Sequence, residues 1–219
     1  MSLDALDFER GIETYWSEIA SRSYEIQARE RVFPELAEKY SARQPPHFTR
    51  SDLELIFRWK YTDARWCNRA LDGLSTVSDD SLRFVTGTIS QTVSARDAAR
   101  SLRHAIRGVG IAGISAILAA ARPDRFPVID VFALTAIRRY YDLEWVKNVP
   151  HDKDGKLQAD EPSYAPYAAF CCDRATELSH STGHDWTPRR VDMALWGIGK
   201  DLFKAAQCDP EYREAIRFV

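Results

Sequence analysis

The chain has 219 residues, of which 45% are hydrophobic and 28% are charged, and its formal net charge is −2. A chain of this length can bury a sizeable core, as one domain or as two closely packed lobes. No segment approaches the ~20 consecutive apolar residues of a membrane span, and the polar N-terminus does not resemble a secretory signal. These features predict a cytoplasmic protein without a membrane partner, and the near-neutral charge argues against a general nucleic-acid binder.

The four cysteines form no disulfide framework, and the adjacent Cys171 and Cys172 indicate reduced, buried thiols. His180 and His184 do not combine with cysteines or acids at the spacing of zinc ligands, so we expect no metal. We also expect no bound cofactor, since no P-loop or dinucleotide-binding fingerprint occurs.

Hydrophobic residues recur at helical spacing along most of the chain, and no segment alternates as a strand does, which predicts an all-α fold. Residues 142–163 are polar and aperiodic, so we expect an exposed loop or lid there. The linker 44–46 is the first plausible lobe boundary. Helices are expected at residues 4–21, 23–41, 53–61, 78–93, 94–107, 111–121, 130–141, 164–178 and 188–207.

The most informative stretch runs from residue 94 to residue 133. It predicts a helix capped by Ser94, a tight turn at 108–110, a second apolar helix, a proline-containing connection and an acid, Asp130, at the start of a third helix. The glycines of the turn tolerate left-handed or crowded backbone. The first helix carries an arginine stripe that runs into the turn: Arg96, Arg100, Arg103 and Arg107.

Such a turn can hold a phosphate, because a helix N-terminus presents free N–H groups and a partial positive charge. The contact would position a duplex without reading its sequence. An ordinary αα-hairpin with a structural glycine turn is the alternative, and the arginine stripe can equally be a solvated helix face.

The segments RGVGIAGISAIL and RFPVIDVFAL resemble the helix-hairpin-helix motif and catalytic aspartate of the endonuclease III-like DNA glycosylases. The match covers about thirty residues: 106–110 match the hairpin, Ala112 occupies the position of the family's lysine, and Asp130 stands eighteen residues later. The resemblance implies that DNA-backbone contacts come from five hairpin residues and two arginines: Gly108, Val109, Gly110, Ile111, Ala112, Arg103 and Arg107.

The resemblance also implies the architecture. Glycosylases of this family have two helical lobes with the DNA cleft between them, so residues 1–219 would form a single all-α unit. One lobe would comprise 47–128, and the other would combine 1–46 with 129–219. Asp130 would then lie at the mouth of the cleft. The family's iron–sulfur cluster is not expected, because its four closely spaced cysteines are missing.

The chemistry implied is base excision from double-stranded DNA, and no protein partner is implied. Cleavage of an N-glycosidic bond places oxocarbenium character on the sugar, which a carboxylate such as Asp130 can stabilise. Asp130 could instead simply cap the following helix, and both roles are compatible. Ala112 cannot act as the amine nucleophile of bifunctional members, which predicts a monofunctional hydrolase. Lys60 or Lys147 could substitute near the cleft, although nothing in their local sequence indicates it.

An extracted base needs an aromatic pocket. The candidates are Trp59, Tyr61, Trp66 and Trp145, although helical tryptophans more often belong to the core. Arg189 and Arg190 are expected in the first turn of the last helix, facing a carboxylate or a phosphate.

Two rival hypotheses remain. The fold could be a non-catalytic helix-hairpin-helix DNA-binding protein, or the chain could be an unrelated helical protein with a structural glycine turn. An Asp130 that lines an open cleft with aromatic walls would favour the enzyme, whereas a buried and fully bonded Asp130 would favour the rivals.

Overall fold

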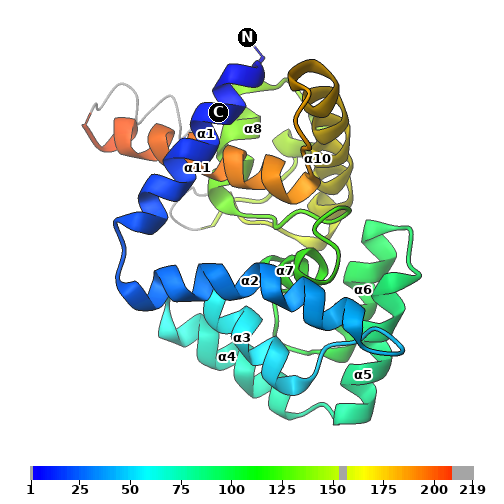
Figure 1. Ribbon diagram of the computed structural model, residues 1–219. Helices are drawn as coiled ribbons and strands as arrows, with labels where there is room; N and C mark the ends of the chain where they lie inside the picture. The colour runs from blue at the N-terminus through cyan, green and yellow to red at the C-terminus, as the bar shows by residue number, and fades with distance from the viewer. Residues whose placement is uncertain (1, 153–156, 209–219) are drawn as a thin grey trace.

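The computed structural model describes residues 2–152 and 157–208 of the chain. The described residues are mostly helical and contain no β-strand, which confirms the all-α prediction. The helices form two groups, one above the other in Figure 1, and both groups share a hydrophobic core.

The lower group consists of six consecutive helices and a short 3-10 turn. Its members are α2 (Tyr24–Ala42), α3 (Arg50–Lys60), α4 (Ala64–Ser75), α5 (Asp79–Gly87), η1 (Thr88–Ser90), α6 (Ala95–Ala105) and α7 (Ile111–Ala121).

Helix α7 forms the centre of this group and is almost wholly buried, as its run of alanine and isoleucine predicts. It packs against α2, α3 and α6. The small side chains let these neighbours approach closely. The side chain of Ser115 in α7 also accepts a hydrogen bond from the Ile129 amide, at 3.1 Å, so α7 holds the segment that leads to Asp130.

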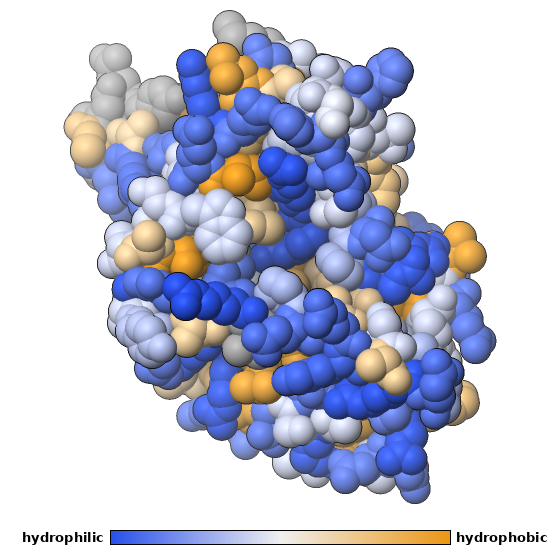
Figure 2. Space-filling model, in the orientation of Figure 1, coloured by the Kyte–Doolittle hydropathy of each residue, from blue (hydrophilic) through white to orange (hydrophobic). Residues whose placement is uncertain are grey.

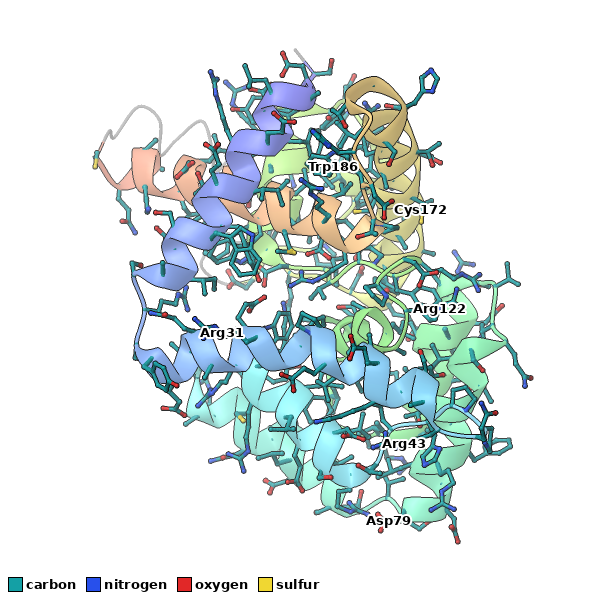
Figure 3. All side chains as sticks on the ribbon, in the orientation of Figure 1. Arg31, Arg43, Asp79, Arg122, Cys172 and Trp186 are labelled. Atoms are coloured by element: carbon teal, nitrogen blue, oxygen red, sulfur yellow. The ribbon has the colours of Figure 1, made fainter. Side chains whose placement is uncertain are left out.

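Helix α2 belongs to the lower group, although the sequence analysis placed residues 1–46 with the C-terminal helices. Its residues Phe33, Leu36 and Tyr40 are buried, and the Tyr40 hydroxyl donates a hydrogen bond to the Thr86 carbonyl. Arg43, labelled in Figure 3, follows α2 and forms an ion pair with Asp52 of α3 at 2.7 Å. The chain therefore crosses between the two groups after α1 rather than at the linker 44–46.

The upper group brings the first helix together with the last ones. It contains α1 (Ala5–Ala20), α8 (Val131–Tyr140), α9 (Glu144–Lys147), α10 (Glu161–Thr182) and α11 (Pro188–Cys208). Helix α11 packs against α1, α8 and α10, as Figure 1 shows. The crossing of α1 and α11 is close because glycines meet there: a Cβ at Gly197 would overlap the Gly11 carbonyl group.

Two segments differ from the helices expected from the sequence. Helix α4 was not predicted, because the dense aromatic and basic residues around Trp66 concealed its buried stripe of Cys67, Ala70 and Leu74. The expected loop 142–163 contains the short helix α9, with Val146 buried against the core. Part of that loop, 153–156, lies outside the described residues.

We expect Gly197→Ala to destabilise the fold, because the added methyl group must push α1 and α11 apart. Overpacking of this kind costs about 3 kcal/mol, and for a chain of this size 1 kcal/mol corresponds to ~2–4 °C in melting temperature. Thermal unfolding followed by circular dichroism measures the change. Gly110→Ala is the control, since its Cβ would meet no atom within 4 Å. An equal loss in both variants would contradict the close packing at this crossing.

Candidate functional site

A cavity of about 190 Å³ lies between the two groups of helices. Figure 2 shows the surface hollowed between them, on a face that is otherwise mostly hydrophilic. The upper group contributes α1, α8 and α11, and the lower group contributes α2 and α3. The residues that line this cavity include Tyr15, Arg22, Arg29, Glu30, Trp59, Lys60, Thr62, Val128, Asp130, Phe132, Arg189, Asp192 and Trp196.

Asp130 caps helix α8 and also faces the cavity. One carboxylate oxygen, Oδ1, accepts a hydrogen bond from the Phe132 amide at 3.0 Å, as expected of an N-cap. The other oxygen, Oδ2, accepts a hydrogen bond from the Lys60 ammonium at 2.9 Å. The side chain retains 23% of its exposure. Asp130 is thus a structural cap and, at the same time, a carboxylate accessible from the cavity.

Lys60, the last residue of α3, brings a positive charge from the lower group to the start of α8. Its side chain is only 9% exposed, and its ammonium also approaches the Ile129 carbonyl at 3.4 Å. A buried ammonium is stable only when acceptors surround it. The Asp130 carboxylate and the Ile129 carbonyl are these acceptors, so a lysine can be buried at the end of α3. The ion pair Lys60–Asp130 therefore links the two groups of helices across the cavity.

A second ionic cluster forms the inner wall of the cavity, and Arg189 is at its centre. Arg189 forms an ion pair with Asp192, one helical turn along α11, and lies 3.6 Å from the Glu30 carboxylate of α2. All three side chains are less than a tenth exposed. The Val128 amide donates a hydrogen bond to Asp192 at 2.6 Å. Burial raises the pKa of Asp192 to about 7, although Arg189 and the Val128 amide lower it.

Glu30 connects this cluster to the aromatic walls. Its two carboxylate oxygens accept hydrogen bonds from the Tyr15 hydroxyl and from the indole N–H of Trp59. Burial raises the pKa of Tyr15, so its hydroxyl stays protonated and continues to donate. The guanidinium of Arg189 also lies over Trp59, 5.1 Å from the ring centroid. These bonds fix the plane of the Trp59 indole.

Aromatic rings face the cavity from four helices. Trp196 of α11 packs edge-on against Tyr15 and Phe132, with ring centroids 5.4 Å apart in both pairs. Trp59 packs against Phe33 at 4.2 Å. Flat, apolar walls with a few polar groups between them are typical of pockets that bind a planar ring.

Two arginines from the start of α2 and the turn before it line the same cavity. Arg29 forms an ion pair with Glu25 and donates to the Arg58 carbonyl at 2.8 Å. Within 2–152 and 157–208, Arg22 has no ion-pair partner. Arg22 and Arg29 are half-buried, whereas the carboxylates Glu30 and Asp192 of the same cavity are buried.

The glycine turn has the geometry that the sequence predicts. Gly108 has a φ of +84°, which favours glycine, and Gly110 is the N-cap of α7. Both glycines are exposed, whereas the side chains of Val109 and Ile111 are buried and hold the turn in place. Ala112 is half-buried. The turn therefore offers backbone N–H groups to solvent at the start of a buried helix.

Tyr61 connects this turn with the cavity, because it directly follows Lys60 in the chain. A Cβ on Gly113, in the first turn of α7, would overlap the Tyr61 hydroxyl. Burial raises the pKa of Tyr61 to about 12. Of the four aromatic candidates from the sequence, only Trp59 lines the cavity, and Tyr61 packs beside it in the core.

The other predicted residues lie elsewhere. Trp66 is 45% exposed on α4, and Trp145 packs against Tyr167 at 6.5 Å. Arg103 forms an ion pair with Glu161 of α10 at 2.8 Å. Arg107 is exposed beside the glycine turn. The structure therefore places Asp130 with Trp59, and not with Trp66 or Trp145.

Several residues of the cavity were missed by the sequence analysis. Tyr15, Glu30, Asp192 and Trp196 come from three helices, α1, α2 and α11, and match no motif. The one available signal was Arg189, an arginine unfavourably placed in the first turn of a helix, where a nearby carboxylate was one of the two partners expected. The structure shows that its partners are carboxylates.

Among the described residues, no group of three or more His, Cys, Asp or Glu side chains could hold a metal ion. No helix of the described part is long and apolar enough to span a membrane. Comparison of the chain with protein-family models, curated proteins and solved structures gave no match.

We expect Asp192→Asn to lower the free energy of unfolding by about 3–5 kcal/mol, because the change leaves Arg189 without its nearest counter-charge in a buried site. Urea unfolding measures this difference. Glu177→Gln is the control: it breaks an ion pair of the same i,i+3 spacing with Arg174, but on the surface, where the cost is about 1 kcal/mol or less. Similar losses in the two variants would show that the buried cluster adds no stability of its own.

Proposed function

We propose that the protein is a monofunctional DNA N-glycosylase that removes a damaged base by hydrolysis, with Asp130 as the catalytic carboxylate. One observation carries the proposal: Asp130 lies in a cavity with aromatic walls, at the start of a helix that follows an exposed helix-hairpin-helix turn. A non-catalytic DNA-binding protein would not need a carboxylate exposed to such a cavity.

The reaction needs a negative charge beside the sugar. As the bond between C1′ and the base nitrogen breaks, its electron pair leaves with the base and the sugar becomes an oxocarbenium ion. Asp130 would stabilise this cation and orient a water molecule, whose oxygen then bonds to C1′. The proton of that water is released to solvent or to the leaving base.

Lys60 would position Asp130 in this reaction. Its ammonium bonds to Oδ2, while the Phe132 amide bonds to Oδ1, so the carboxylate is held from both sides. Such fixed partners keep the carboxylate in one orientation and remove the cost of reordering it during the reaction.

The cavity and the turn would hold different parts of the DNA. A base rotated out of the duplex would stack between the aromatic side chains of the cavity, near Trp59 and Trp196. The exposed N–H groups at Gly108 and Gly110 would bind a backbone phosphate. Tyr61 packs against α7 and directly follows Lys60, so the proposed phosphate site would be connected to the Lys60–Asp130 pair through the end of α3.

The test is release of free base from duplexes that carry different damaged bases, at low salt. We expect wild type to release one class of base and Asp130→Asn to lose the activity by about 10²-fold or more, as for other lost electrostatic contacts in active sites. Asp124→Asn is the control, because Asp124 precedes Asp130 in the same connection but pairs with Arg122 (labelled in Figure 3) outside the cavity. Equal activity in wild type and Asp130→Asn would exclude the proposed role.

A second candidate function follows from the position of Lys60. Its ammonium lies 2.9 Å from Asp130 in the same cavity, so the amine could attack the sugar in place of water. The amine nitrogen would bond to C1′ as the base leaves with the electron pair of the glycosidic bond, and opening of the sugar ring would give a covalent imine. Loss of a proton from C2′ would then eliminate the 3′ phosphate and cut the strand.

Borohydride treatment of a reaction on an abasic duplex separates the two functions, because it reduces an imine to a stable cross-link. The monofunctional proposal predicts an intact strand and no cross-link. A cross-link that Lys60→Met abolishes, and that Lys147→Met preserves, would instead support the second candidate. Lys147 is a suitable control, since it pairs with Asp142 outside the cavity.

A further inference from the structure

Helix α4 has an exposed face that the proposed function does not use. It carries Arg65, Trp66 and Arg69, which we call the α4 face. Trp66 is 45% exposed, and both guanidinium groups lie over its ring, at 5.0 Å and 5.8 Å from the centroid. The opposite side of α4, with Cys67, supplies the buried contacts of this helix.

The α4 face lies between the cavity and the glycine turn. At one end, α4 begins two residues after Thr62, which lines the cavity. At the other end, a Cβ on Gly73 would overlap the Arg107 carbonyl, and a Cβ on Gly108 would lie 3.8 Å from the Arg69 carbonyl. Helix α4 therefore spans from the mouth of the cavity to the phosphate-binding turn.

The positive charges of the α4 face are not paired with acidic side chains among the described residues. Arg65, Arg69 and Arg107 are exposed, and in the described part of the chain none of them forms an ion pair. The neighbouring Asp63 is occupied as the N-cap of α4, where it accepts a hydrogen bond from the Arg65 amide at 2.8 Å. The α4 face thus combines an exposed aromatic ring with positive charge.

These features fit a single strand of nucleic acid better than a paired one. An unpaired base can stack on an exposed tryptophan, while arginines bind the phosphates on either side of it. In a duplex both faces of each base are already stacked, so the ring would find no partner. An acidic protein surface would satisfy the arginines but would give the tryptophan nothing to stack on.

We propose that the α4 face binds an unpaired base of the strand held at the glycine turn, with Trp66 as the stacking platform and Arg65 and Arg69 on the flanking phosphates. The proposal rests on the proposed function only in its choice of nucleic acid as the ligand. It assigns the protein a preference for DNA with unpaired bases, such as a single strand or a duplex with a bulge.

The test measures binding of a fluorescent oligo-dT and of a blunt duplex of equal length, at low salt, by anisotropy. We expect wild type to prefer oligo-dT, and Trp66→Ala to weaken oligo-dT binding about tenfold while leaving duplex binding unchanged. Trp66→Phe should keep most of the affinity, because a ring remains. Phe84→Ala is the control, since Phe84 is an exposed aromatic residue of α5, 76% exposed, with no arginine stacked on it in the described structure.

Charge and stacking are separated by two polyanions without bases, polyphosphate and polyglutamate. We expect Arg65→Ala to weaken binding of both oligo-dT and polyphosphate, and Trp66→Ala to weaken only oligo-dT. Equal binding of oligo-dT by wild type and Trp66→Ala would overturn the proposal, and so would stronger binding of polyglutamate than of oligo-dT, which would indicate an acidic protein partner.

The two proposals fail separately. Trp66-dependent binding of oligo-dT without base release would refute the glycosylase and retain the α4 face. Base release that requires Asp130, with no effect of Trp66→Ala on binding, would do the reverse.

Discussion

The buried cluster around Arg189 is the interaction on which the rest of the structure depends. Its carboxylates come from both groups of helices: Glu30 from α2 and Asp192 from α11. Tyr15 and Trp59 add hydrogen bonds from α1 and α3. A buried guanidinium is stable only while these partners surround it, so the cluster ties the two groups of helices together at the wall of the cavity.

The same cluster determines where Asp130 lies. Asp192 accepts a hydrogen bond from the Val128 amide, two residues before Asp130, and Ser115 of α7 accepts one from the Ile129 amide. The two backbone amides just before Asp130 are thus hydrogen-bonded to different helices, one to α11 and the other to α7. Lys60 then reaches Asp130 from α3. The carboxylate is held by the fold itself, which is the property that electrostatic catalysis requires.

The local features of the fold could be predicted from the sequence, and the site could be predicted only in part. The glycine turn, the buried helix α7 and the capping role of Asp130 follow from short-range rules, since each depends on residues within one or two helical turns. The contacts of Arg189 with Glu30 and Tyr15, and of Lys60 with Asp130, join residues 70 or more positions apart, and no local pattern encodes them. Trp66 is an aromatic residue of the kind that forms a base pocket. However, the burial of Cys67, Ala70 and Leu74 turns Trp66 to the exposed side of α4, away from the cavity.

The central claim, that Asp130 stabilises positive charge on a sugar held in the cavity, can be tested without knowing the base. A duplex that contains a pyrrolidine in place of one sugar mimics the cationic transition state, and its affinity can be compared with that of a duplex containing the neutral tetrahydrofuran analogue. Transition-state mimics bind at least about 10²-fold more tightly than ground-state analogues. We predict that wild type prefers the pyrrolidine duplex to this extent and that Asp130→Asn loses the preference. Equal binding of the two duplexes by wild type would contradict the account.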